Sequence, residues 1–332
     1  MEAQLPLIWA AIIGVAVMMY VVLDGFDLGI GLLFPFAGSE AERDQMMRSI
    51  APFWDGNETW LVMGGGGLLV AFPLAYSILM PALYVPIIVM LLGLIFRGVA
   101  FEFRLIARRK AGWNFAFAGG SLVATLAQGC ALGGLIQGIA VRDNAFAGGT
   151  FDWLSPLSLI CGAGLLAGYA LLGATWLIWR TEGPVAERAR RQAVVLLGAV
   201  LVAMGAVSLY TPLAFARIAE RWFSMPNILW LWPVPLLTLL LAFAAWRLID
   251  RHDWAPFAAA IGLFALGYLG LVISTFPYLV PPSLTIWEAA AAPSSQAFML
   301  AGTAVLLPVI LGYTFWSYWL FRGKVKEGET YH

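Results

Sequence analysis

The sequence predicts an all-α integral membrane protein. Hydrophobic residues make up 61% of the 332-residue chain and charged residues only 11%, and the mean hydropathy is +0.85. A soluble globular domain carries roughly 25% charged residues. The chain also contains several uncharged apolar runs of about 18 residues or more, enough to cross the ~30 Å hydrocarbon layer as a helix. Because lipid cannot satisfy backbone polar groups, runs of this length must be helical.

Nine apolar runs define the predicted transmembrane helices of one polytopic domain that spans residues 1–332. The first run lacks a basic leading segment and a small-residue cleavage site, which predicts an uncleaved first helix. The first two runs carry acids where each meets the loop between them. Basic segments or Pro-rich loops separate the later runs. The nine runs lie near residues 5–35, 51–74, 78–96, 115–140, 156–179, 193–216, 228–246, 256–276 and 296–320.

The distribution of basic residues predicts the topology. Short basic loops stay in the cytoplasm, and placing alternate loops on opposite sides puts 16 of the 19 Lys and Arg on one side. The other side holds only Arg142, Arg217 and Arg221. The pattern predicts an outside N-terminus and a cytoplasmic C-terminus. The 16 are Arg43, Arg48, Arg97, Arg104, Arg108, Arg109, Lys110, Arg180, Arg188, Arg190, Arg191, Arg247, Arg251, Arg322, Lys324 and Lys326.

Two other interpretations of the charges are disfavoured. The basic loops could bind lipid headgroups, but they are short and contain acids such as Glu182 and Glu187, so determining topology is the favoured role. The formal net charge is zero and no polybasic tail is present. The composition therefore gives no indication of a nucleic-acid partner.

The stretch VVLDGFDLGIG places two acids, Asp24 and Asp27, one helical turn apart inside the first apolar run. A helix that enters from outside near residue 5 reaches Asp24 after about 28 Å, so the acids are expected toward the cytoplasmic face. Gly25 and Gly29 form a GxxxG pair, which predicts close helix approach. Calcium binding is excluded because the loop lacks the later bidentate Glu.

A second acidic cluster opens the second run, in APFWDGNETWL, where Asp55 and Glu58 repeat the same spacing beside Trp54. Both clusters face the same loop, so up to four carboxylates can gather at one cytoplasm-side point. Ionised groups inside a membrane normally face protein or water. The set therefore favours a polar route leading inward from the cytoplasm.

A purely structural role for these acids stays open. Asp24 or Asp55 can also cap a helix or pair with Arg43, Arg48 or Arg97. Buried Gln128 on the fourth run is expected to hold helices together, as polar side chains in membranes usually do.

Residues that bind cofactors are scarce. A haem or metal protein usually needs His, and the chain has only His252 and His332, both outside the predicted spans. Cys130 and Cys161 lie in apolar stretches without CxxC spacing, which indicates core residues. The sequence predicts a membrane subunit with no metal site and no cofactor of its own.

Four segments together identify a resemblance. LDGFDLGIG, SIAPFWDGNETWL, FRGVAFEFR and FPYLVPPSLTIWEAAAAPSSQ resemble, in order and spacing, the signature segments of subunit II of cytochrome bd-type quinol oxidases. The resemblance implies a heterodimer in the bacterial cytoplasmic (inner) membrane. Its subunit I binds the haems and the quinol, and its subunit II packs nine helices as two four-helix bundles plus one. The complex oxidises membrane quinol and reduces O2 to water with protons from the cytoplasm.

The resemblance also implies roles for the acids. Asp55 of the WDGN segment lines the start of a proton pathway at the boundary with subunit I, and Trp54 is its neighbour. Asp27 and Asp24 belong to the same polar region. Glu58 occupies a position where other members can carry a non-acidic residue such as Gln, so the resemblance leaves its role open between reinforcing the cluster and belonging to the pathway. No motif places the structural quinone or the small accessory subunit found in some members, and no catalytic residue is assigned to this chain.

Two alternative functions remain. Acids and glycines within membrane helices also mark proton-coupled secondary transporters, although here the acids cluster toward one face rather than at the midplane. The third hypothesis is a structural scaffold, in which neutralising Asp55 would leave turnover unchanged.

Overall fold

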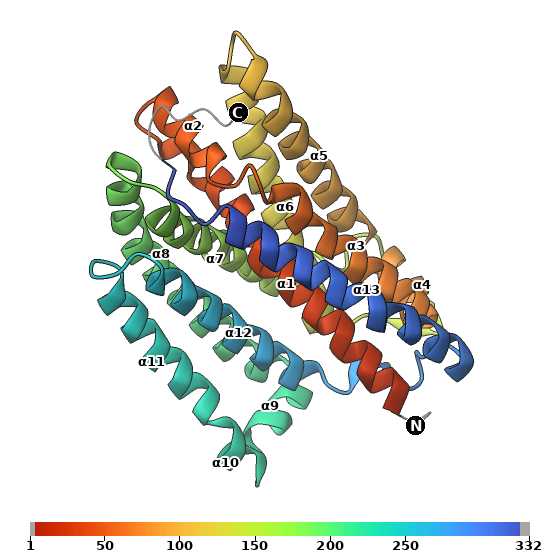
Figure 1. The fold of residues 1–332 in the computed structure, drawn as a ribbon. Coiled ribbons are helices and arrows are strands. Elements are labelled where there is room, and N and C mark those ends of the chain that lie inside the picture. Colours follow the sequence, from red (N-terminus) through yellow and green to blue (C-terminus); the bar gives the residue numbers. More distant parts are fainter. Residues whose placement is uncertain (1–3, 326–332) are drawn as a thin grey trace.

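Eight helices in the computed structural model are long and apolar enough to cross a membrane (Figure 1). The structure describes residues 4–325, so Lys326 and His332 lie outside the described residues. The long helices are α1 Leu5–Leu33, α5 Tyr84–Ile106, α6 Ala111–Gln137, α7 Pro156–Arg180, α8 Pro184–Ala214, α11 Pro233–Leu248 (preceded by α10 Asn227–Leu231), α12 Ala255–Thr275 and α13 Pro293–Leu320.

The remaining elements are short or polar. The helix α3 has 18 residues, but Asp55, Asn57 and Glu58 near its start lower its hydropathy, and it is not among the eight. The other elements are η2 Phe34–Phe36, α2 Glu40–Arg48, α3 Trp54–Ala71, α4 Pro73–Ala82, α9 Ala216–Phe223, and the hairpins β1 Val141–Arg142 with β2 Ala145–Phe146 and β3 Tyr278–Val280 with β4 Leu284–Thr285.

Serine and proline determine where several helices begin. The Ser39 hydroxyl accepts a hydrogen bond from the Glu42 backbone N–H at the start of α2, and Ser155 caps α7 in the same way. Proline occupies the start of α4, α7, α8, α11, α12 and α13. A proline there is tolerated because the first turn needs no donor from its backbone.

Two predicted boundaries are wrong. The sixth run was expected to begin near residue 193, but α8 begins at Pro184 and includes Arg188, Arg190 and Arg191, which were expected in the preceding loop. The third run was expected to end at residue 96, with Arg97 in a cytoplasmic loop, but α5 begins at Tyr84 and continues to Ile106. Arg97 and Arg104 are both buried on this helix, where each pairs with carboxylates of neighbouring helices. The apolar run ends at Arg97 in sequence, whereas the helix continues because its cations are neutralised.

The loops predicted to share the cytoplasmic side lie at one end of the bundle. In Figure 1, α2 and the turn between α5 and α6 lie at the end of the bundle opposite the start of α1. Ion pairs join these parts: Arg104 contacts Glu40 and Asp44 at 2.8 and 2.6 Å, and Lys324 contacts Asp253 at 2.8 Å. Arg188 of α8 also pairs with Glu42 of α2.

The two loops at the other end pack on each other. The backbone N–H of Ile139 donates to the Pro281 carbonyl at 2.8 Å. The preceding residue, Gly138, has a φ of 107°, a conformation that favours glycine. Nearby, buried Gln296 donates to the Ala71 carbonyl at 2.9 Å and ties the start of α13 to the end of α3.

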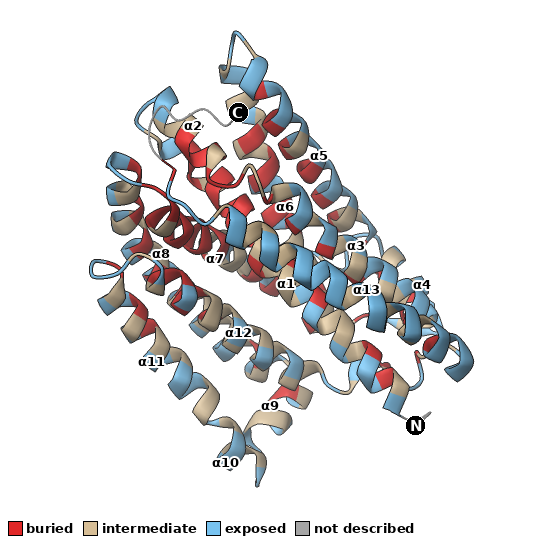
Figure 2. Cartoon of the chain, viewed as in Figure 1, coloured by how far each residue is buried: buried red, intermediate tan, exposed pale blue. Residues whose placement is uncertain are grey.

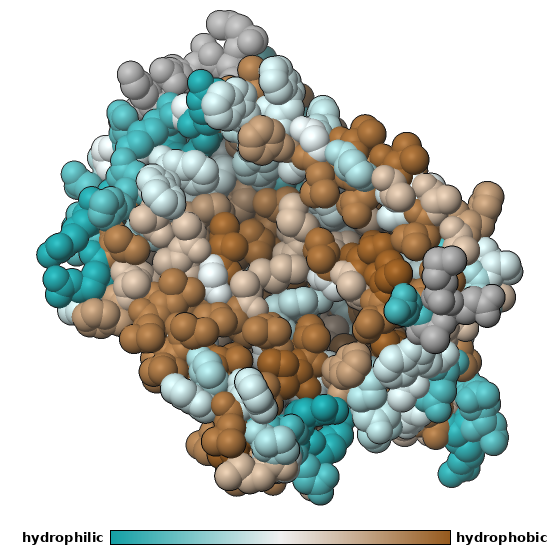
Figure 3. Space-filling view, turned by 60° about the horizontal axis from the view of Figure 1, so that its bottom comes forward, coloured by the Kyte–Doolittle hydropathy of each residue, from teal (hydrophilic) through white to brown (hydrophobic). Residues whose placement is uncertain are grey.

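Burial is concentrated around α1 and α7. Figure 2 shows buried residues along α7 and part of α1, whereas α13 is pale along most of its length. In the most apolar window of α7 61% of residues are buried, against 0% for α13. Figure 3 shows apolar side chains across the middle of one face and hydrophilic ones toward its edges, as expected of a surface that contacts lipid or another membrane protein.

Glycine permits the closest contact between α1 and α7, which confirms the predicted GxxxG role. A Cβ at Gly29 would lie 1.8 Å from the Tyr169 carbonyl oxygen, and one at Gly25 would lie 2.8 Å from the Tyr169 ring. Across the contact, a Cβ at Gly173 would lie 2.5 Å from the carbonyl carbon of Gly29. The two cysteines are buried and free, as predicted for core residues.

We expect Gly29→Ala to force α1 and α7 apart and to lower stability by about 1–3 kcal/mol, the usual cost of overpacking. Gly198→Ala on α8 is the matched control, because a Cβ there meets no atom of this chain within 4 Å. Thermal unfolding in detergent measures the difference. Equal melting temperatures for the two variants would contradict this account of the contact.

The ion pairs also predict a pH dependence. Burial alone would raise the pKa of Asp44, but hydrogen bonds from Arg104 and Lys110 outweigh burial and hold this pKa below its usual range. A folded-state pKa below the unfolded value of about 3.9 stabilises the protein above that pH, and the contribution is lost as pH falls through the folded pKa.

Asp44→Asn should therefore lower the melting temperature by about 2–4 °C at neutral pH. The difference from the unmodified protein should shrink as the pH falls below about 4. Asp250→Asn, at an exposed position beyond α11, is the control and should show no such dependence. A constant difference at all pH values would exclude the proposed ion-pair contribution of Asp44.

Candidate functional site

A buried arginine joins carboxylates from two neighbouring helices. Arg97 on α5 donates from Nη1 to Asp24 Oδ1 on α1 at 2.5 Å, and from Nη2 to Glu58 Oε2 on α3 at 2.8 Å. Arg97 and Asp24 are almost fully buried, whereas the Glu58 side chain is 32% exposed. The Asp24–Arg97 pair is one of the alternatives that the sequence left open.

The second acid of α1, Asp27, is held by amide and phenol groups. The Asn57 side-chain amide donates to Asp27 Oδ2 at 2.8 Å and to the Leu23 carbonyl at 3.3 Å. The Tyr318 hydroxyl of α13 in turn donates to Asn57 Oδ1 at 2.8 Å. Asp27 is therefore connected through one amide to the last helix of the chain.

Asp55 lies at the edge of this group. It is exposed in the first turn of α3, one turn before Glu58, and Trp54 beside it is half-buried against Phe101 with ring centroids 5.1 Å apart. Accessibility falls in order from exposed Asp55 through partly exposed Glu58 to Asp24 and Asp27, each 0% exposed. We call Asp24, Asp27, Asp55, Glu58 and Arg97 the acid cluster.

The structure brings together most of the residues that the sequence singled out. Asp24, Asp27 and Glu58 converge around Arg97, while Asp55 stands at the exposed rim and Trp54 packs on an aromatic ring. Assigning Arg97 to a loop was wrong. Sequence analysis also missed the contribution of Tyr318, which lies 261 positions from its partner Asn57 and carries no local motif.

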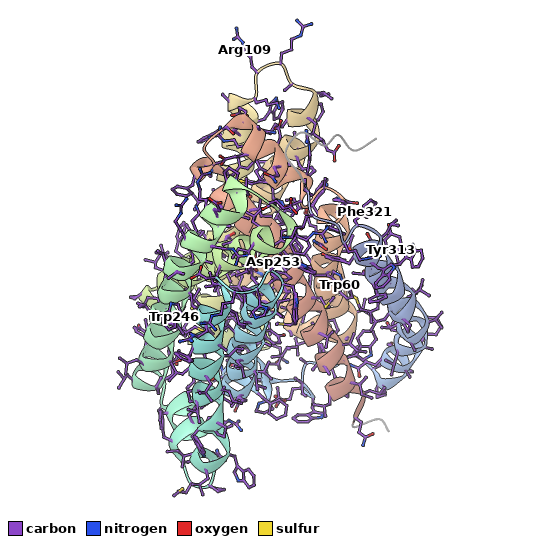
Figure 4. The ribbon with its side chains drawn as sticks, turned by 60° about the vertical axis from the view of Figure 1, so that its left-hand side comes forward. Trp60, Arg109, Trp246, Asp253, Tyr313 and Phe321 are labelled. Atoms are coloured by element: carbon purple, nitrogen blue, oxygen red, sulfur yellow. The ribbon has the colours of Figure 1, made fainter. Side chains whose placement is uncertain are left out.

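Aromatic rings form one wall beside the cluster. Phe26, between the two acids of α1, stacks on Trp176 with centroids 4.1 Å apart, and Phe53, just before α3, stacks on Tyr318 at 4.3 Å. Figure 4 shows Trp60 on α3 and Phe321 at the end of α13, with Tyr313 on the part of α13 that faces away from the bundle. The wall places an apolar boundary against the carboxylates, which strengthens electrostatic interactions among them.

The charge balance suits proton exchange. Three carboxylates, Asp24, Asp27 and Glu58, face one guanidinium, and one oxygen each of Asp24 and Asp27 has no hydrogen-bond partner among residues 4–325. A carboxyl oxygen without a donor can hold a proton. Because these groups lie close together, a change of charge on one of them alters how readily the others hold a proton.

Within residues 4–325, no three His, Cys, Asp or Glu side chains are grouped as metal ligands. His252 is exposed in the loop between α11 and α12. A haem iron held by a buried imidazole does not fit these residues, so no chemical step is assigned to a haem in this chain.

Removing Arg97 should be costly, because it leaves buried carboxylates unpaired. We expect Arg97→Met to destabilise the protein by about 3–5 kcal/mol, and the double variant Arg97→Met/Asp24→Asn to recover part of the loss. The control is Arg109→Met, at the exposed turn beyond α5 where the side chain extends away from the protein (Figure 4). Equal stability of the two single variants in thermal unfolding would show that Arg97 does not neutralise the cluster.

Comparison with known proteins places this chain in a family. A model of the family described as cytochrome bd terminal oxidase subunit II matches residues 5–321. Cytochrome bd-I ubiquinol oxidase subunit 2 of Escherichia coli (strain K12) is 32% identical, over 98% of this chain and 96% of that protein. Cytochrome bd ubiquinol oxidase subunit 2 of Bacillus subtilis (strain 168) is 30% identical, over 99% and 100%.

A solved structure has a similar fold. A chain in the structure of bd oxidase from Geobacillus thermodenitrificans aligns with a TM-score of 0.76 at 18% identity, covering 96% of this chain and 98% of that one. Family model and relatives agree along nearly the whole length, including the segments that hold the acid cluster. The chain therefore belongs to the subunit II family of cytochrome bd terminal oxidases and is a subunit of an oxidoreductase.

Proposed function

We propose that this chain is the cofactor-poor subunit of a membrane quinol:oxygen oxidoreductase of aerobic respiration. It packs against a haem-binding subunit I and supplies a proton-uptake path that faces the cytoplasm. The related proteins are named as ubiquinol oxidase subunits, which supports the reaction class. The haems, bound by the partner, supply the electron transfer to oxygen, while the residues of this chain handle protons.

The observation that carries the proposal is the graded accessibility of the acid cluster. Asp55 is exposed, Glu58 is partly exposed, and Asp24 and Asp27 are buried. Carboxylates placed in this order can take protons from water and pass them inward. Reduction of oxygen to water consumes protons, so a path of this kind serves the reaction directly.

Each acid has a distinct part in the proposed path. Asp55 accepts a proton from water and passes it to Glu58, one turn further along α3. Glu58 shares Arg97 with Asp24, so a proton that arrives on Glu58 weakens its bond to the guanidinium and changes the charge that Asp24 and Asp27 experience. Asp27 then holds the proton at the inner end, next to Asn57 and the last helix.

The proposed topology has nine membrane spans, namely the eight long apolar helices and α3, which follows α1 as the second span in sequence order. The N-terminus lies outside and the end that carries α2 and the basic loops faces the bacterial cytoplasm. The grouping of these loops at one end of the bundle supports this orientation, since short basic loops stay cytoplasmic. The acids of α1 and α3 then lie on the cytoplasmic half of their helices, near the source of protons.

Neutralising the outer acids tests the path. We expect Asp55→Asn and Glu58→Gln to slow oxygen consumption with quinol by at least about tenfold, because general acid–base groups typically contribute 10²–10⁴-fold. Both variants should still assemble with the haem-bearing partner, as its absorption spectrum would report. Asp143→Asn in the β1–β2 turn is the control and should retain normal turnover.

Unchanged turnover in both Asp55→Asn and Glu58→Gln would overturn the proton-path proposal and favour the scaffold hypothesis. The transporter hypothesis is tested with proteoliposomes that contain this chain alone. We expect no substrate-dependent proton flux there, because the proposed path ends at a reaction site that only the complete oxidase contains.

A further inference from the structure

Three polar side chains from three helices are joined next to the acid cluster. The Tyr169 hydroxyl of α7 donates to Gln128 Oε1 of α6 at 2.8 Å, and Gln128 Nε2 donates to the Tyr20 hydroxyl of α1 at 2.7 Å. The tyrosines are 0% and 5% exposed, and Gln128 is half-buried. We call these three residues the Tyr–Gln–Tyr chain. Gln128 thus joins α6 to α1 and α7, which is the helix-joining role expected of it.

The Tyr–Gln–Tyr chain is held in a fixed position against α1. Tyr20 precedes Asp24 by four residues, so both side chains lie on one face of α1 about one turn apart. A Cβ atom at Gly25 would lie only 2.8 Å from Cε1 of the Tyr169 ring, too close for a normal contact. The glycine beside Asp24 therefore makes room for the tyrosine that begins the chain.

The Tyr20 hydroxyl has a hydrogen-bond donor that the contact with Gln128 does not use. A phenol has one O–H donor, and the oxygen of Tyr20 already accepts from Gln128, so its own proton is not used within the Tyr–Gln–Tyr chain. Asp24 Oδ1 is bound by Arg97, whereas Oδ2 has no hydrogen-bond partner among the described residues. An unused donor thus lies beside an acceptor that lacks one.

We propose that Tyr20 is a positioning residue of the acid cluster, which donates its O–H to the Asp24 carboxylate and is oriented by Gln128 and Tyr169. This inference rests on the proposed proton path. Hydrogen bonds to ionised groups are the strong ones, so the bond keeps Asp24 ionised as the permanent counter-charge of Arg97. A proton that enters through Glu58 is then carried by Asp27 and is not retained on Asp24.

Several charged and polar groups surround Asp24, and each of them influences how readily its carboxylate takes up a proton. Arg97 faces it from α5, Glu58 from α3 and Asp27 from the next turn of α1, while the phenols of Tyr20 and Tyr169 approach from α1 and α7. Without the Tyr20 hydroxyl, only Arg97 favours the ionised form of Asp24. Protonation of Asp24 then releases Arg97, so turnover should fail at a higher pH than in the unmodified oxidase.

The test is the pH profile of quinol oxidase turnover in the assembled complex in native membranes. We expect Tyr20→Phe to move the acidic limb of the profile upward by about one pH unit, the effect of one hydrogen bond to a charged group. Tyr169→Phe and Gln128→Leu should move the limb in the same direction by less, since they only orient Tyr20. These two variants also carry the test if Tyr20→Phe does not assemble.

Tyr268→Phe is the matched control. Its hydroxyl donates to the Gly14 carbonyl of α1 at 3.0 Å, so the variant removes a phenol bound to the same helix but remote from Asp24. We expect its profile to match the unmodified oxidase. Superimposable profiles for Tyr20→Phe and Tyr268→Phe would overturn the inference.

The outcome separates two failures. If Asp55→Asn and Glu58→Gln slow turnover while the Tyr20→Phe profile stays in place, the proton path stands and the positioning role of Tyr20 is wrong. If those acid variants turn over normally, the proton path itself fails, and the positioning role fails with it.

Discussion

The bridge from Arg97 to Asp24 and Glu58 is the interaction on which the rest of the site depends. A guanidinium buried between membrane helices needs carboxylate partners, because an unpaired charge in a low-dielectric region costs several kcal/mol. The partners come from α1 and α3, so the cation fixes how α1, α3 and α5 sit against one another. The same requirement lets α5 continue past Arg97 as a helix.

The glycines of α1 allow α7 to pack closely against the segment that carries Asp24 and Asp27. Two buried acids need polar partners, but those partners must approach through closely packed helices. Gly25 and Gly29 have no side chains where the Tyr169 ring and backbone lie. Helix α7 can therefore approach α1 closely enough for the Tyr169 phenol to lie beside the acids of α1. Close packing and polar contact are therefore satisfied by adjacent positions of one short segment.

Much of this arrangement could be predicted from the sequence, and the remainder could not for physical reasons. Hydropathy locates α1, α7, α12 and α13 closely, and one-turn spacing identifies both acid pairs. The sequence misplaced Arg97, because a cation at the end of an apolar run usually marks the end of a span, and only its three-dimensional partners show otherwise. Tyr169 and Tyr318 carry no local signal, since their partners Gln128 and Asn57 lie 41 and 261 positions away. Tyr20 lies one turn before Asp24, but its bond to Gln128 spans 108 positions.

The weak attachment of α13 has a consequence for biogenesis. This helix is last in the chain, buries none of its most apolar window, and is held near its two ends by Gln296 and Tyr318. Among the helices of residues 4–325 it leaves the ribosome last, so the earlier helices can pack before it docks. Tyr318 then reaches Asn57 only when α13 arrives, so the amide that donates to Asp27 gains its own donor only after this helix has docked.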